Sequence, residues 1–144
     1  MPAAEPGVLE NGVTNEMELE LLKTIIEVVK IMIPVLTGFL VIFGKAIDVK
    51  WKELGATKKD IYIVLAIGIV GFLSFGCWAG ALANVVIAMS GEDSCILLIH
   101  IENSKAPLYA RKFVGMAYNL FVTTVALSAW YYISMVWRST KNKN

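Results

Sequence analysis

The feature that most constrains this chain is a long uncharged run, from Ile61 to Gly91. As a helix it is about 46 Å long at ~1.5 Å rise per residue, whereas ~20 residues already cross the ~30 Å hydrocarbon core of a bilayer. A charged side chain at mid-bilayer costs about 2.5–3.5 kcal/mol, so the lack of charge over this length favours a membrane span. A second run, Phe113 to Trp137, is also uncharged. We predict one membrane-spanning helix in each run.

A third apolar run is shorter, because only the segment from Ile31 to Gly44 is uncharged. Lys30 and Lys45 bracket this run, and both can extend their ammonium groups outward along apolar stems. With that extension the run also reaches about 30 Å. We therefore expect a first transmembrane helix here, with an interfacial or re-entrant segment as the alternative. Pro34 predicts a kink in this helix, since it removes one backbone hydrogen bond.

The composition supports this assignment. Hydrophobic residues make up 57% of the 144 residues and charged residues only 17%, against about 25% charged in soluble domains. A chain this short has too few polar residues to shield two long apolar helices from water. The fold class we predict is all-α: a polytopic membrane protein with three transmembrane helices and an amphipathic N-terminal extension of the first. The lipid bilayer is its first expected partner.

The expected organisation follows from the alternation of apolar and polar stretches. In chain order we predict a disordered N-terminal tail (1–15), an amphipathic helix that continues into the first span (16–47), a Lys-rich cytoplasmic loop (48–60), the second span (61–90), an outer connection with an interfacial segment (91–112), the third span (113–137) and a basic cytoplasmic tail (138–144).

Charge distribution predicts the orientation. Eight of the 13 Lys and Arg residues lie between 45 and 60 or after 137, and the other five lie on the opposite side of the three spans. Basic residues accumulate on the cytoplasmic side of membrane proteins. We therefore expect the N-terminus outside, the C-terminus inside, and a location in the cell (inner) membrane. The net charge is only +1, which excludes a strongly basic nucleic-acid binder.

A charged stripe precedes the first span. Its spacings of 4, 3, 4 and 3 residues place five charged side chains on one helical face: Glu16, Glu20, Lys23, Glu27 and Lys30. Two interpretations stay open. The stripe is either the solvated face of an interfacial helix, or a surface for self-association that faces a neighbour or lines a pore vestibule.

Small and polar residues inside the second and third spans suggest helix packing. Small residues let helix backbones approach closely, and an intramembrane Asn can add an interhelical hydrogen bond. We expect Asn84 and Asn119 to make contact, because they reach nearly the same depth in antiparallel helices. The alternative is that each amide bonds a backbone carbonyl separately. The helix-packing candidates are Gly76, Gly80 and Asn84 in the second span, and Gly115, Asn119 and Thr123 in the third.

Catalytic machinery is not recognisable in the sequence. The single histidine, His100, has Asp93 and Cys95 nearby but matches no known ligand spacing. The chain contains no GxSxG, HExxH or CxxC pattern and no Gly-rich phosphate loop. We therefore predict no catalytic, cofactor-binding or metal-binding residues, and no enzymatic activity.

These observations favour a small multi-pass membrane protein that acts through helix-helix association, as an accessory subunit, sensor or anchor. Its expected partner is a second copy or another membrane protein. The alternative is an oligomeric pore former or membrane-disrupting effector. The short chain, three spans and basic tail with Arg138, Lys141 and Lys143 resemble the three-span phage holins, a likeness that implies assembly of many chains into a membrane lesion.

Overall fold

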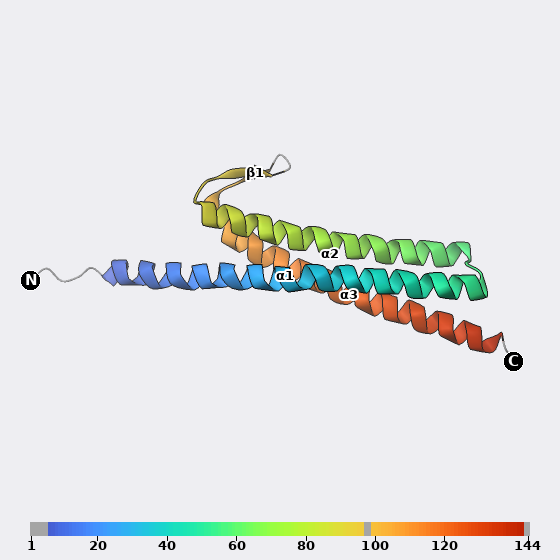
Figure 1. Ribbon diagram of the computed structural model, residues 1–144. Helices are drawn as coiled ribbons and strands as arrows, with labels where there is room; N and C mark the ends of the chain where they lie inside the picture. The colour runs from blue at the N-terminus through green and yellow to red at the C-terminus, as the bar shows by residue number, and fades with distance from the viewer. Residues whose placement is uncertain (1–5, 97–98, 143–144) are drawn as a thin grey trace, which may run out of the picture.

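The computed structural model describes residues 6–96 and 99–142, and nearly all of them are helical. Three long helices run back and forth along the bundle: α1 from left to right in Figure 1, α2 back to the left, and α3 to the right again. Each is long and apolar enough to cross a membrane, which confirms the all-α class with three candidate spans. The helices are α1 (Pro6–Leu54), α2 (Lys58–Ser90) and α3 (Ala106–Lys141); the short elements between α2 and α3 are β1 (Ser94–Ile96), β2 (Ile99–Ile101) and the 3-10 turn η1 (Asn103–Lys105).

The first helix is longer than the sequence suggested. It begins at Pro6, whereas we expected a start near Asn15. Proline suits the first helical position, because its missing N–H would have no partner there. Residues 1–5 of the predicted tail lie outside the described residues. The helix also continues through Pro34 without interruption.

The loop between α1 and α2 is much shorter than the predicted 48–60 segment, because only residues 55–57 connect the two helices. Gly55 ends α1 with φ of 73°, a left-handed conformation that glycine adopts easily. Thr57 begins α2 as its N-cap. The lysines in this region are good helix formers. Those that are exposed lie on α1 and α2: Lys45, Lys52, Lys58 and Lys59.

The connection between α2 and α3 contains an antiparallel strand pair in which Ser94 pairs with Ile101. The segment that we predict to be interfacial thus includes two short strands, β1 and β2. Asn103 fixes the end of this connection to α2, since its Nδ2 donates to the carbonyl of Ile87 at 2.6 Å and to that of Ala88 at 3.3 Å. It thereby satisfies carbonyls that the last turn of a helix leaves without partners.

Three clusters of buried apolar side chains hold the bundle together. The smallest contains Ile87, Ile101 and Ala106, where the connection between α2 and α3 meets the two helices. The largest, on the same side of the bundle, contains Leu22, Ile25, Val29, Leu36, Trp78, Ala81, Val85, Ala110 and Ala117. The cluster near the 55–57 turn contains Ile47, Ile67, Tyr131 and Met135. The closest packing along the bundle is between α2 and α3.

One glycine brings all three helices together at mid-length. A Cβ atom built on Gly71 would lie 3.1 Å from Cδ2 of Leu40 on α1 and 3.4 Å from Cγ2 of Thr124 on α3. Nearby, the hydroxyl of Ser74 donates to the carbonyl of Ala117 at 2.9 Å, which links α2 directly to α3. These contacts place Leu40, Gly71 and Thr124 at one level of the bundle.

Replacing Gly71 should therefore force the helices apart. We expect Gly71→Leu to destabilise the bundle by about 1–3 kcal/mol, because the added side chain overpacks a filled site. The matched control is Gly76→Leu, since a Cβ atom at Gly76 would meet nothing within 4 Å. Unfolding in mild detergent, followed by circular dichroism, measures both variants. Equal losses in the two would contradict the packing described here.

Candidate functional site

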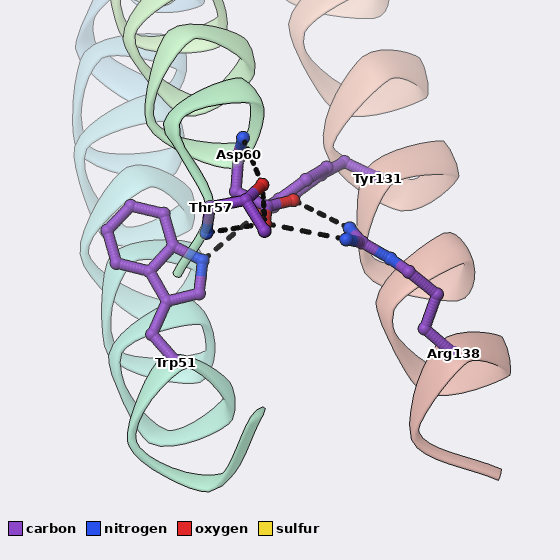
Figure 2. Close-up of polar contacts among 5 residues, drawn as sticks. All are labelled: Trp51, Thr57, Asp60, Tyr131 and Arg138. Carbon is purple, nitrogen blue, oxygen red and sulfur yellow. Dashed lines mark hydrogen bonds and ion pairs between the residues drawn. The ribbon is translucent and has the colours of Figure 1, made fainter. Parts of the chain in front are cut away.

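The most connected polar group of the described residues lies where α1 ends, α2 begins and α3 ends. Its members come from the last turn of α1, the start of α2 and the last turns of α3 (Figure 2). We call it the Asp60 cluster; it contains Trp51, Thr57, Asp60, Tyr131 and Arg138.

Local sequence fixes the carboxylate. Thr57 and Asp60 form a capping box, in which the two side chains each accept a hydrogen bond from the other residue's backbone N–H. The Thr57 hydroxyl also donates to Oδ2 of Asp60 at 2.6 Å. A negative charge in the first turn of a helix is favourable, because the helix dipole is positive there. Asp60 is therefore positioned by its own helix start.

Arg138 neutralises this carboxylate across the bundle. Its Nη2 lies 2.6 Å from Oδ1 of Asp60 and its Nη1 lies 3.4 Å from Oδ2, so the guanidinium spans both oxygens. The Asp60 side chain is only 4% exposed, whereas that of Arg138 is 47% exposed. A carboxylate this buried needs a paired charge, and Arg138 supplies it from the surface.

The first helix joins the cluster through an aromatic contact. The indole Nε1 of Trp51 donates to the hydroxyl of Tyr131 at 3.1 Å. Tyr131 is buried and belongs to the apolar cluster at this end of the bundle. The Asp60–Arg138 pair thus ties α2 to α3, and the Trp51–Tyr131 bond ties α1 to α3.

Asp60 lies just outside the uncharged run of α2, and the electrostatics of the cluster keep it ionised. The Arg138 guanidinium holds the pKa of this carboxyl well below its usual range, and the hydrogen bonds from Thr57 act in the same direction, while burial opposes them. Both oxygens already have donors. The arrangement is therefore that of an ion pair held in place by hydrogen bonds within the chain.

The structure separates the predicted packing residues of α2. A Cβ atom on Gly80 would lie 3.2 Å from the ring of Phe113, so Gly80 lies against α3. Asn84 is buried, and its Nδ2 donates to the carbonyl of Gly80 at 2.8 Å. Gly76 lies on the exposed face. Gly80 therefore contacts α3, whereas a Cβ atom on Gly76, one turn earlier, would meet nothing within 4 Å.

The predicted packing residues of α3 all lie on its exposed face: Gly115, Asn119 and Thr123. The expected Asn84–Asn119 contact is wrong within the single chain. Asn84 Oδ1 is buried without a partner among the described residues, and Asn119 lies on the exposed face of α3. The two residues also differ in level, because Asn119 is close to Ala117, which contacts Ser74, whereas Asn84 lies one turn beyond Gly80, which contacts Phe113. In addition, α3 turns Ala110, Ala117 and Thr124 inward instead of Asn119.

The charged stripe of α1 is exposed over its whole length. Glu27 and Lys30 form an ion pair of 2.9 Å on this surface. The opposite side of the helix buries Leu22, Ile25 and Val29 in the bundle. The remaining members, Glu16, Glu20 and Lys23, also face away from α2 and α3.

Sequence reasoning missed the Asp60 cluster, although two signals pointed to it. The spacing of Thr57 and Asp60 is that of a capping box, and Asp60 and Arg138 each stand directly beside an uncharged run.

Within residues 6–96 and 99–142, no three His, Cys, Asp or Glu side chains group closely enough to hold a metal ion. His100 Nε2 lies 3.9 Å from Oδ2 of Asp93 on an exposed surface.

Comparison with protein-family models, with curated proteins and with solved structures gave no match. What the chain does has to be argued from its geometry.

Removing the charge of Asp60 should weaken the contact that joins α2 to α3. We expect Asp60→Asn to cost about 1–3 kcal/mol of stability, because the variant loses charged hydrogen bonds and leaves Arg138 unpaired. Asp48→Asn is the control: it removes an exposed pair with Lys52, which is expected to contribute less than about 0.5 kcal/mol. Denaturant titration in detergent compares the two. A loss in the control as large as that of Asp60→Asn would refute the assigned role.

The same ion pair predicts a pH dependence. Since the pKa of Asp60 is lowered on folding, its stabilisation is fully present above the pKa of an unfolded aspartate, about 3.9. It is lost as pH falls below that value toward the folded pKa. The stability difference between the wild type and Asp60→Asn should therefore be constant from pH 8 to 5 and shrink below about pH 4. A difference that changes between pH 8 and 6 would show that another group controls it.

Proposed function

We propose that this chain is a small multi-pass membrane protein without catalytic activity that acts through helix-helix association, as an accessory subunit, sensor or anchor. The observation that carries the proposal is the position of Asn119. It lies on the exposed face of α3, inside the uncharged run between Lys112 and Arg138.

The depth of Asn119 follows from the contacts in the bundle. It is seven residues beyond Lys112, about 10 Å along the helix axis at ~1.5 Å per residue. It is five residues before Thr124, which lies at the level of Leu40 and Gly71 on the other helices. With the three helices crossing a bilayer, this amide faces the hydrocarbon core.

An amide in that position favours a partner helix. Burying such a group without a hydrogen bond is costly in an apolar medium. The backbone carbonyl of Asn119 accepts from the Thr123 hydroxyl at 2.8 Å, and its side-chain amide forms no hydrogen bond with any of the described residues. Gly115, on the same face, would meet nothing within 4 Å if it carried a Cβ atom. A second backbone can therefore approach closely at this level.

A second copy of the chain is the partner that this amide suits best. Two copies inserted with the same orientation can be related by a twofold axis along the membrane normal, which brings each residue to the same depth in both chains. A carboxamide both donates and accepts hydrogen bonds, so Asn119 complements itself across that axis. The orientation we propose, N-terminus outside and C-terminus inside, is supported by the lysines near the 55–57 turn.

Replacing Asn119 should weaken self-association without unfolding the chain. We expect Asn119→Leu to reduce the association constant by about 3- to 20-fold, the range found for interhelical polar contacts in membranes. Energy transfer between donor- and acceptor-labelled copies in lipid vesicles measures it. Tyr118→Leu, at the neighbouring exposed position, is the control. Unchanged energy transfer in Asn119→Leu would rule out this interface.

The exposed charged stripe of α1 favours the second candidate, an oligomeric pore former. Lys23, Glu27 and Lys30 face away from the bundle, as the lining of a water-filled path between several copies requires. Leakage of a dye from vesicles, together with large assemblies in detergent, would support this function. Intact vesicles with energy transfer at the level of a dimer would support association alone.

A further inference from the structure

The end of the bundle that holds the Asp60 cluster carries an excess of positive charge. Its acidic residues are already engaged within the chain: Lys52 pairs with Asp48 at 2.7 Å, Lys50 with Glu53 at 2.9 Å, and Arg138 with Asp60 at 2.6 Å. Four lysines at this end are exposed and form no ion pair within the part of the chain that the structure describes: Lys45, Lys58, Lys59 and Lys141.

Two of these lysines share a helical face with an exposed aromatic residue. On α2, Lys58 is followed four residues later by Tyr62, which is 70% exposed; on α3, Trp137, 67% exposed, precedes Lys141 by four residues. Residues four apart are neighbours on a helix surface. Although the helices run in opposite directions, in both pairs the aromatic residue is on the side of the apolar span and the lysine lies beyond it. The pairs approach the same end of the bundle (Figure 1).

This arrangement matches the layers of a membrane surface. Tyr and Trp side chains lie at the boundary between hydrocarbon and headgroups. A lysine one helical turn farther out is then at the level of the lipid phosphates. Basic residues next to a span attract negatively charged lipids.

We propose that the Lys58–Tyr62 and Trp137–Lys141 pairs bind the headgroups of anionic phospholipids in the leaflet at this end of the bundle. The aromatic rings set the depth of each site. The ammonium groups interact with the lipid phosphate, whose negative charge in an anionic phospholipid is not offset by the rest of the headgroup. The opposite end does not offer the same excess, because exposed glutamates such as Glu16 and Glu20 accompany its lysines. The inference is independent of the proposed self-association.

The native tryptophans allow a direct test. Trp130 and Trp137 are the strongly exposed tryptophans among the described residues, and both lie on the last third of α3. Bromine atoms on lipid chains quench tryptophan fluorescence on contact. The purified full-length chain is reconstituted in phosphatidylcholine vesicles that contain brominated phosphatidylglycerol or, in parallel, brominated phosphatidylcholine at the same fraction. The expected result is stronger quenching by the anionic lipid.

The double variant Lys58→Gln/Lys141→Gln should reduce the preference for phosphatidylglycerol at least fivefold, since each basic residue near an anionic surface contributes about fivefold. The matched control is Lys23→Gln/Lys112→Gln, which removes two exposed lysines from the other end and should retain the preference. No preference in the wild type, or the same loss in both double variants, would overturn the proposal. Energy transfer between copies, measured on the same samples, reports self-association separately.

Discussion

The structure depends on the neutralisation of one buried carboxylate. Asp60 stands at the start of α2, directly before the uncharged run Ile61–Gly91, where an unpaired negative charge would be costly. Arg138 reaches it from the end of α3, and Thr57 holds it from the turn. This pairing brings the last turns of α3 beside the start of α2. Trp51 then joins α1 to the same point through Tyr131. A few polar contacts therefore hold the three helices in register at one end. Apolar packing fixes their relative positions along the rest of the bundle.

Apolar packing along the bundle is close but not uniform. Gly71 lets α1 approach α2 and α3 at mid-length, and Gly80 accommodates the ring of Phe113 toward the end that carries β1 and β2. Between them, the Ser74–Ala117 hydrogen bond joins α2 and α3. These two helices form the most extensively packed pair. α1 packs less extensively and leaves its charged side, with Glu27 and Lys30, open.

Much of the fold was predictable from the sequence, because the absence of charge over Ile61–Gly91 and Phe113–Trp137 leaves few alternatives to membrane-length helices. The helix ends were not. Lys50 and Lys52 suggested a loop, yet they belong to the last turns of α1, where ion pairs within the helix engage both. The packing residues were only partly identified, since helical spacing defines a face but does not tell which neighbour that face meets. Gly80 turned out to face α3, whereas Asn119 faces outward. The Asp60–Arg138 pair joins residues 78 positions apart, a separation that local patterns cannot bridge.

The continuity of α1 has a mechanical consequence. The helix extends past the ends of its two neighbours on the N-terminal side (Figure 1), and residues 15–20 there are exposed. It then continues as a single helix through Pro34 to Trp51. One continuous helix therefore joins the protruding segment to Trp51, whose only described side-chain hydrogen bond goes to Tyr131. A shift of α1 along its own axis would have to break this bond or move Tyr131 with it. The position of the protruding segment is thus coupled to the Asp60 cluster.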